Sequence, residues 1–316
     1  MKVFVAGASG ALGTQMIPQL VARGHEVTGM TRSEGKRELI AGLGARPVVA
    51  DALDPDAVAR AVGEATPDAI IHQLTALSGS VKDIRNVDRA FAETNRLRRE
   101  GTDHLLSAAR AVGARRFVAQ SFGGWPYARE GGPVKTEEDP LDPDPPRTLR
   151  ETLSAIRYLE NAVLTAEPIE GIALRYGGFY GPGTSLGLDP VGEQVEAVGK
   201  RRFPIVGSGG GVLSFIHIED AATATVAAVE SGRPGVYNIV DDEPAPAREW
   251  LPALAQAVGA KPPRRVPRWV GRLLAGEALT TMMTEARGAS NEKAKPELGW
   301  QPRYPSWRQG FATGLR

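Results

Sequence analysis

The chain has 316 residues, of which 42% are hydrophobic and 24% charged, and this composition is typical of a globular protein rather than a disordered one. Its 38 lysines and arginines oppose 37 acidic residues, so a formal charge of +1 excludes a basic field for nucleic acid or an anionic membrane. The chain has no cysteine, which excludes disulfides and thiolate catalysis, and its four histidines show no metal-ligand spacing. We expect a cytoplasmic protein that binds a small-molecule substrate and needs no metal, nucleic acid or membrane.

Apolar runs bounded by turn residues alternate with amphipathic segments along the N-terminal half, and this alternation predicts parallel strands joined by helices. The expected strands span residues 2–6, 26–31, 46–50, 69–73, 115–120 and 172–176. The expected helices span residues 12–23, 36–43, 54–63, 83–112 and 148–166. We therefore predict an α/β fold built on a Rossmann-type doubly wound parallel sheet.

After Tyr176 the chain enters the glycine- and proline-rich stretch GGFYGPGTSLGLDP, and the later elements are shorter. This change predicts a smaller C-terminal α/β lobe that binds the substrate. The dinucleotide-binding domain is expected to comprise residues 1–176 and about 213–243, and the substrate lobe about 177–212 and 244–316. We interpret SGGGV, residues 208–212, as a hairpin loop because no helix start follows it.

The sequence GASGALG, residues 7–13, follows the first strand and opens the first helix, as a dinucleotide-binding loop does. Its glycines allow a tight turn, close approach to a pyrophosphate and close packing of helix on strand, while the helix N-terminus supplies amide donors. We predict that the cofactor contacts this loop and the carboxyl ends of the strands. The predicted cofactor-binding residues are Gly7, Ser9, Gly10, Ala11, Leu12, Gly13, Arg32, Asp51, Ala52, Leu74, Thr75, Asn95, Ser121, Tyr176 and Phe179.

The second strand ends in Thr31-Arg32-Ser33, where an NAD-binding chain usually places an acidic residue for the ribose hydroxyls. A guanidinium and two hydroxyls suit a 2′-phosphate, so NADP(H) is favoured, with NAD(H) as the alternative. Arg32 as a solvated loop charge is the competing interpretation. Asp51 is placed to accept a hydrogen bond from the adenine amino group, although it could instead cap a helix, a role that suits Asp54 better.

These motifs resemble the extended branch of the short-chain dehydrogenase/reductase superfamily, the NAD(P)-dependent epimerases and dehydratases. The resemblance covers essentially the whole chain. Besides the glycine loop, its motifs are DAIIHQLTAL, RRFVAQS, ALRYGGFYGPG, FIHIEDAA, GVYNIVDDEP and KPELGWQPRYPSW. The resemblance implies a nicotinamide cofactor and a possible homodimer formed through two long helices, here 83–112 and 148–166.

In that family a Tyr-x-x-x-Lys pair on the helix before the sixth strand acts as acid and base. The matching positions here hold Thr152 and Ile156, and residues 136–199 contain no lysine, so the active site is atypical. Three residues are our catalytic candidates. Tyr127 could replace the donor, Ser121 could orient a carbonyl, and Thr152 occupies the tyrosine position, although its hydroxyl is too weak an acid unaided. For Tyr127 the competing interpretation is an aromatic ring packed under its loop.

Relatives that act on nucleotide sugars commonly hold the diphosphate with Asn after the sixth strand and Arg before the FIHI-like strand. The matching positions read Gly177-Gly178-Phe179 and Val212-Leu213-Ser214, and a buried diphosphate without such partners would be costly. Apolar side chains would suit a mostly carbon ligand, and the candidates are Trp125, Phe179, Leu186, Trp269, Met282 and Met283.

We therefore predict an NADP(H)-dependent oxidoreductase or redox isomerase that acts on a non-nucleotide carbonyl or conjugated small molecule. Two alternatives remain open at this point. One is a nucleotide-sugar epimerase or dehydratase whose acid–base group has moved, and the other is a non-catalytic dinucleotide-binding sensor.

Overall fold

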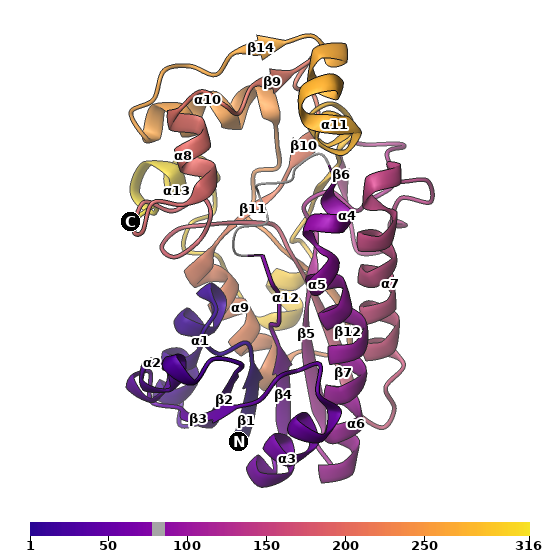
Figure 1. Ribbon diagram of the computed structural model, residues 1–316, viewed down its shortest axis with the longest axis vertical. Coiled ribbons are helices and arrows are strands. Elements are labelled where there is room, and N and C mark those ends of the chain that lie inside the picture. The colour runs from indigo at the N-terminus through magenta and orange to yellow at the C-terminus, as the bar shows by residue number, and fades with distance from the viewer. Residues whose placement is uncertain (78–85) are drawn as a thin grey trace.

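A seven-stranded parallel sheet lies at the lower end of the computed structural model in Figure 1, which describes residues 1–77 and 86–316. Its strand order is β12-β7-β5-β4-β1-β2-β3, the Rossmann order extended by one strand. The strands are β1 (Lys2–Ala6), β2 (Glu26–Thr31), β3 (Arg46–Val49), β4 (Ala69–His72), β5 (Arg116–Phe122), β7 (Glu170–Tyr176) and β12 (Gly235–Ile239). The predicted α/β fold and doubly wound sheet are confirmed.

Helices cover both faces of this sheet because its strands are apolar on both faces. Val3 and Val5 of β1 face one hydrophobic core, and Phe4 faces the other, as the two-residue period of a strand requires. The helices that surround the sheet are α1 (Ala11–Ala22), α2 (Arg37–Gly42), α3 (Pro55–Ala65), α6 (Thr102–Val112), α7 (Arg150–Leu164) and α9 (Ile218–Ser231). The helix α1 packs on α9, and α3 packs on α6.

The prediction of one continuous helix over residues 83–112 is wrong. Residues 83–85 lie outside the described residues, and the rest form α4 (Val87–Ala90), α5 (Ala92–Arg96), the π-helical turn Leu97–Gly101 and α6. Phe91, with φ −99° and ψ 7°, interrupts the helix between α4 and α5. π-Helical turns such as Leu97–Gly101 are frequent at functional sites. Residues 86–100 contain no proline or glycine that would reveal this turn in the sequence.

The second lobe lies above the carboxyl ends of the strands in Figure 1 and has its own core. Its short strands pair as β8 (Gly178–Tyr180) with β11 (Phe215–His217), β9 (Ile205–Val206) with β14 (Arg265–Val266), and β10 (Val212–Leu213) with β13 (Ala245–Pro246). A further pair, β6 (Val134–Lys135) with β15 (Gly288–Ala289), joins the loop after β5 to this lobe. Its helices are α8 (Glu193–Gly199), α10 (Ala247–Ala257), α11 (Arg268–Glu285) and α13 (Trp307–Thr313), and the short α12 (Ala294–Leu298) packs on α9.

The segment 208–212 is not a hairpin loop, because the strands on its two sides, β9 and β10, pair with different partners. Its glycines instead allow a close approach to α11. The amide of Gly211 donates to the carbonyl of Met283 at 2.9 Å, and a Cβ at Gly211 would lie only 2.0 Å from the carbonyl oxygen of Met282. No helix within residues 1–77 and 86–316 is long and apolar enough to cross a membrane.

Candidate functional site

The glycine loop has the close contacts that its sequence predicts. Gly7 has φ 95°, and a Cβ there would lie 2.7 Å from the carbonyl oxygen of Gln73. A Cβ at Gly13 would lie 2.5 Å from the carbonyl oxygen of Ala8. Only glycine fits at these two positions, which hold the loop tightly against the ends of β1 and β4.

The N-terminus of α1 is free to bind an anion. Gly10 is its N-cap and provides no side-chain cap, and the first turn carries no acidic residue. The amides that follow Gly10, starting with those of Ala11 and Leu12, therefore lie at the positive end of a helix that neither its N-cap residue nor an acidic residue of its first turn compensates. Leu12 itself is buried in the core. This arrangement fits the pyrophosphate of a dinucleotide.

A hydroxyl pair links the glycine loop to the end of β2. Ser9 Oγ lies 3.1 Å from Thr31 Oγ1, which also accepts from the Ser33 amide at 3.3 Å. The amides of Gly7 and Ala8 donate to the carbonyl of Met30 at 3.2 and 3.1 Å. The residues after β2 are thus held beside the loop, where the adenosine end of a dinucleotide would lie.

Arg32 extends from the end of β2 into solvent and forms an ion pair with Glu93 of α5. Asp51 is exposed, and its Oδ1 accepts from the Leu53 amide at 2.9 Å. Asp54, rather than Asp51, caps α3 by accepting from two backbone amides at 3.0 and 3.1 Å. The Asp51 carboxylate therefore remains accessible for the predicted adenine contact.

The other predicted cofactor residues lie after β3 and β4, at the ends of β5 and β7, in β8 and in α5. Ala52 is buried, Leu74 packs on the same core, and Thr75 is half-buried beside it. The Phe179 ring lies 5.3 Å from that of Tyr176. The Tyr176 hydroxyl lies 2.6 Å from Thr225 Oγ1, and burial raises the pKa of Tyr176. Tyr176 can therefore form a wall of the site but is a poor acid.

The positions of the tyrosine–lysine pair are occupied by Thr152, whose hydroxyl is bonded to another side chain, and by the apolar Ile156. Thr152 is 1% exposed, and its hydroxyl donates to Asp88 at 2.7 Å and accepts from Asn95 Nδ2 at 3.2 Å. Ile156 is fully buried. Within residues 1–77 and 86–316, the buried Oδ1 atom of Asn95 has no hydrogen-bond partner. The geometry argues against Thr152 as a catalytic acid, because its only proton is held by Asp88.

A buried network below β5 contains the other two catalytic candidates. Ser121 donates to Glu160 at 2.6 Å, and Arg175 makes two bonds of 2.7 Å to the same carboxylate. Arg175 Nη1 also donates to the Tyr127 hydroxyl at 3.2 Å, and that hydroxyl donates to Asn238. Sequence reasoning missed Glu160, Arg175 and Asn238, although a charged residue inside the apolar strand EGIALRY was a signal for a buried ion pair.

Tyr127 is not placed as a proton donor. It is 0% exposed, it packs with Val240 and Ala289, and burial raises its pKa to about 12. The competing interpretation, an aromatic ring packed under its loop, describes its surroundings. The Ser121 hydroxyl is likewise committed to Glu160 and points into the network rather than toward a ligand. The hydroxyls of both residues are thus bonded within the protein, and their catalytic role stays a prediction.

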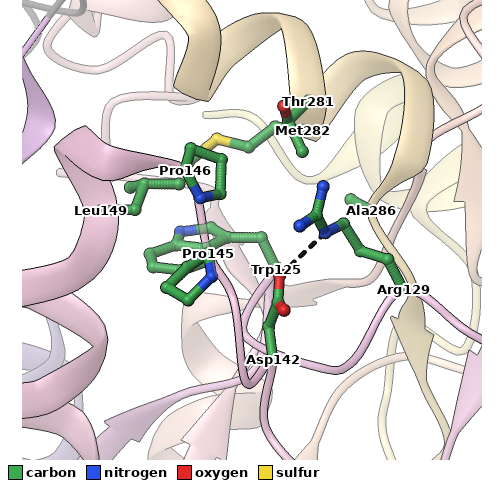
Figure 2. A pocket seen from close by; sticks show the side chains of 9 residues that line it. All are labelled: Trp125, Arg129, Asp142, Pro145, Pro146, Leu149, Thr281, Met282 and Ala286. Atoms are coloured by element: carbon green, nitrogen blue, oxygen red, sulfur yellow. Dashed lines mark hydrogen bonds and ion pairs between the residues drawn. The ribbon is translucent and has the colours of Figure 1, made fainter.

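A small pocket lies between the loop after β5 and α11, and Figure 2 shows its side chains. Its lining residues are Trp125, Arg129, Asp142, Pro145, Pro146, Leu149, Thr281, Met282 and Ala286. Arg129 is paired with Asp142 at 2.8 Å and with Glu285 at 2.9 Å. Two of the predicted apolar pocket residues, Trp125 and Met282, thus line a pocket.

The remaining apolar candidates lie elsewhere. Leu186 and Met283 are buried in the core of the second lobe, and Trp269 is 71% exposed on α11. A nucleotide-sugar anchor is also sterically excluded at Gly177, where a Cβ would lie 2.7 Å from the carbonyl oxygen of Ser214. Among the described residues, no three His, Asp or Glu side chains gather as a metal site.

A Rossmann sheet, a glycine loop and an uncapped helix N-terminus together define a dinucleotide-binding α/β protein. The NAD dependent epimerase/dehydratase family matches residues 3–240, and the chain belongs to this family. The curated relatives of the chain include named reductases and epimerases, so the chain is an NAD(P)-dependent enzyme of the oxidoreductase or epimerase type.

Two curated relatives are reductases. The 3-diazoavenalumate denitrifying reductase of a Streptomyces species is 45% identical over 98% of this chain and 99% of its own length. The 2-alkyl-3-oxoalkanoate reductase of Stenotrophomonas maltophilia is 30% identical over 82% of this chain and 76% of its own length. Among solved structures, the Thermus thermophilus UDP-glucose 4-epimerase complex with NAD is 26% identical, with a TM-score of 0.71 over 100% of this chain and 98% of that one.

Proposed function

We propose that the chain is an NADPH-dependent reductase of a conjugated, non-nucleotide small molecule that works without a tyrosine–lysine proton relay. The observation that carries this proposal is the relay position itself, where the Thr152 hydroxyl is held by Asp88 and Ile156 is buried. Gly7, Gly10 and Gly13 at the start of α1 would hold the pyrophosphate of the cofactor. A reduced nicotinamide, when bound, supplies a hydride.

The chemistry of the substrate decides whether a relay is needed. When hydride adds to a ketone, the oxygen becomes an alkoxide that must be protonated, which is the task of the tyrosine. When hydride replaces the nitrogen of an aryl diazonium, a C–H bond forms and the C–N bond breaks, with its electron pair leaving on neutral N₂. No alkoxide forms, and no proton has to be supplied.

We therefore infer that the substrate class is a diazo-bearing organic acid. The relative that is 45% identical is named for the reductive removal of nitrogen from such a compound, which supports this class. Trp125, Pro145 and Met282 offer apolar surfaces for a flat conjugated skeleton, although the pocket that they line holds only about one water molecule and would have to widen to admit it.

Reduction of a 3-oxo acid is the second candidate, and it is favoured by the relative that is 30% identical. This reaction would need a proton from water or from the substrate, because the buried Tyr127 and Thr152 hydroxyls are both committed. Nucleotide sugars are disfavoured because Gly177 leaves no space for an anchoring side chain.

The deciding experiment measures NADPH oxidation and N₂ release with 3-diazonio-4-hydroxybenzoate, in parallel with NADPH oxidation on a 2-alkyl-3-oxoalkanoate. We expect one N₂ for each NADPH oxidised. With NADPH that carries deuterium at C4 on the face from which the hydride leaves, we expect deuterium in the product at the carbon that carried the nitrogen. Turnover of the oxo acid alone would instead identify a ketoreductase. Cofactor binding without turnover of either compound would contradict the proposal and favour the sensor.

A further inference from the structure

The ion pair between Arg32 and Glu93 connects two segments that are distant in sequence. Arg32 follows β2, directly beside the glycine loop, and Glu93 lies on α5. Both side chains are largely exposed, at 65% and 46%. The pair therefore lies at the open adenosine end of the site rather than in the core.

A second ion pair lies close to Glu93. Its cation, Arg96, makes two bonds of 2.8 Å to Glu100. The bonded Glu100 raises the pKa of Arg96, with smaller contributions from Asp51 and Glu93. Arg96 is thus already paired with Glu100, and Arg32 must separate from Glu93 before its guanidinium can pair with a further anion.

From this geometry we propose that Glu93 is a specificity-determining residue that limits the preference for NADPH over NADH by competing with the 2′-phosphate for Arg32. The proposal rests on the proposed function, since it assumes a nicotinamide dinucleotide in the site. When NADPH binds, a bond between Arg32 and the 2′-phosphate replaces the Arg32–Glu93 ion pair. This exchange is favourable because charge-assisted Arg–phosphate bonds are strong and an exposed ion pair is weak. The released Glu93 carboxylate then lies near a dianion of the same sign.

NADH has no 2′-phosphate, so it leaves the Arg32–Glu93 pair intact, and Glu93 does not weaken the binding of NADH. The two cofactors should therefore respond differently to removal of the Glu93 charge. The change Glu93→Gln keeps the shape of the side chain and removes only the carboxylate charge.

We expect Glu93→Gln to tighten NADPH binding about threefold to tenfold, because it removes both the competition and the repulsion, and to leave NADH within about twofold. Arg32→Ala should weaken NADPH about tenfold or more and leave NADH unchanged. In the Arg32→Ala background, Glu93→Gln should lose the part of its effect that comes from competition for Arg32 and keep only the part that comes from relieved repulsion. The gain from Glu93→Gln should shrink in high salt, because both groups are exposed.

The matched control is Glu196→Gln, which removes the acidic partner of an exposed pair with Lys200 in the second lobe. Fluorescence titrations of all four variants with NADPH and NADH measure the dissociation constants. If wild type binds neither cofactor, the proposed function fails together with this inference. If wild type binds them but Glu93→Gln leaves the NADPH to NADH ratio unchanged or lowers it, this inference alone is overturned.

Discussion

At the scale of single residues, the role of the Thr152 hydroxyl distinguishes two hypotheses. Either the reductase needs no proton relay, or Thr152 has replaced tyrosine as the proton donor. We expect Thr152→Val to keep kcat with the diazonium substrate within about twofold, whereas loss of a general acid costs about 10²- to 10⁴-fold. The change leaves Asp88 and Asn95 without a hydroxyl partner, so stability should fall by about 1–3 kcal/mol. Steady-state kinetics well below the melting temperature check this, and a hundredfold loss of kcat in a folded variant would make Thr152 the donor.

The Glu160–Arg175 pair is a second residue-scale feature, since both side chains are only 7% exposed. We expect Glu160→Gln to destabilise the protein by about 3–5 kcal/mol, because it leaves the Arg175 charge buried without a counter-charge. Urea unfolding measures the difference. Glu170→Gln, which breaks the half-exposed pair with Arg116, is the control and should cost less than about 1 kcal/mol. Equal losses in the two variants would show that burial does not set the strength of the inner pair.

At the scale of elements, Asp88 of α4 fastens the start of α7. Its carboxylate accepts from the Glu151 amide at 3.1 Å and from the Thr152 amide at 2.8 Å, so it caps a helix to which it is not adjacent in sequence. We expect Asp88→Ala to cost about 1–2 kcal/mol, as loss of a capping group does, and Asp88→Asn to recover part of it. Urea unfolding of both variants tests this, and an Asn variant no better than Ala would show that charge matters more than the hydrogen bonds.

The elements that sequence reasoning predicted well are those fixed by local pattern. The strand β1, the glycine loop and α1 follow from an apolar run, glycines at set spacing and an amphipathic helix, each readable within about 20 residues. The π-helical turn at Leu97–Gly101 and the network around Glu160 depend on contacts across the fold, so periodicity could not reveal them. The homodimer through residues 83–112 and 148–166 stays a prediction.

The candidate site also has features that could be predicted from the sequence and features that could not. Gly7 and Gly13 were predictable because a steric requirement leaves a mark in the sequence, and the absence of a lysine from residues 136–199 was visible directly. The hydrogen-bond partners of the candidate hydroxyls could not be predicted from the sequence. Tyr127 and Thr152 are chemically able to give up a proton, and only the tertiary structure shows that Asn238 and Asp88 accept those protons.

At the scale of the whole molecule, the two lobes meet where the chain leaves β12. The Asp241 amide donates to the Phe215 carbonyl of β11 at 2.7 Å, and the Asp242 amide donates to the Pro305 carbonyl just before α13 at 2.9 Å. Asp241 is 1% exposed, and its Oδ1 atom accepts from the Glu243 amide at 3.2 Å. Its Oδ2 atom has no hydrogen-bond partner among the described residues. Burial raises its pKa from the ordinary value of 3.8 to about 8, so the folded protein holds this carboxyl protonated at neutral pH.

This raised pKa predicts how stability depends on pH. Between about pH 4 and pH 8 the folded state keeps a proton on Asp241 that the unfolded state has released, so the free energy of unfolding falls as pH rises. The loss approaches about 1.4 kcal/mol for each pH unit within this window and levels off above it. Asp241→Asn removes the titrating group and keeps its oxygen, so its stability should decline less from pH 5 to pH 8 than that of wild type.

Urea unfolding of both proteins at several pH values between 5 and 8 tests this prediction. Burial also raises the pKa of Asp220 and of Glu137, but these groups titrate in both proteins, and the difference between the two curves isolates Asp241. Parallel curves would show that Asp241 ionises freely and that water reaches the junction between the lobes. Diverging curves would show that the junction is dry, because only a group withdrawn from water keeps its proton so far above its ordinary pKa.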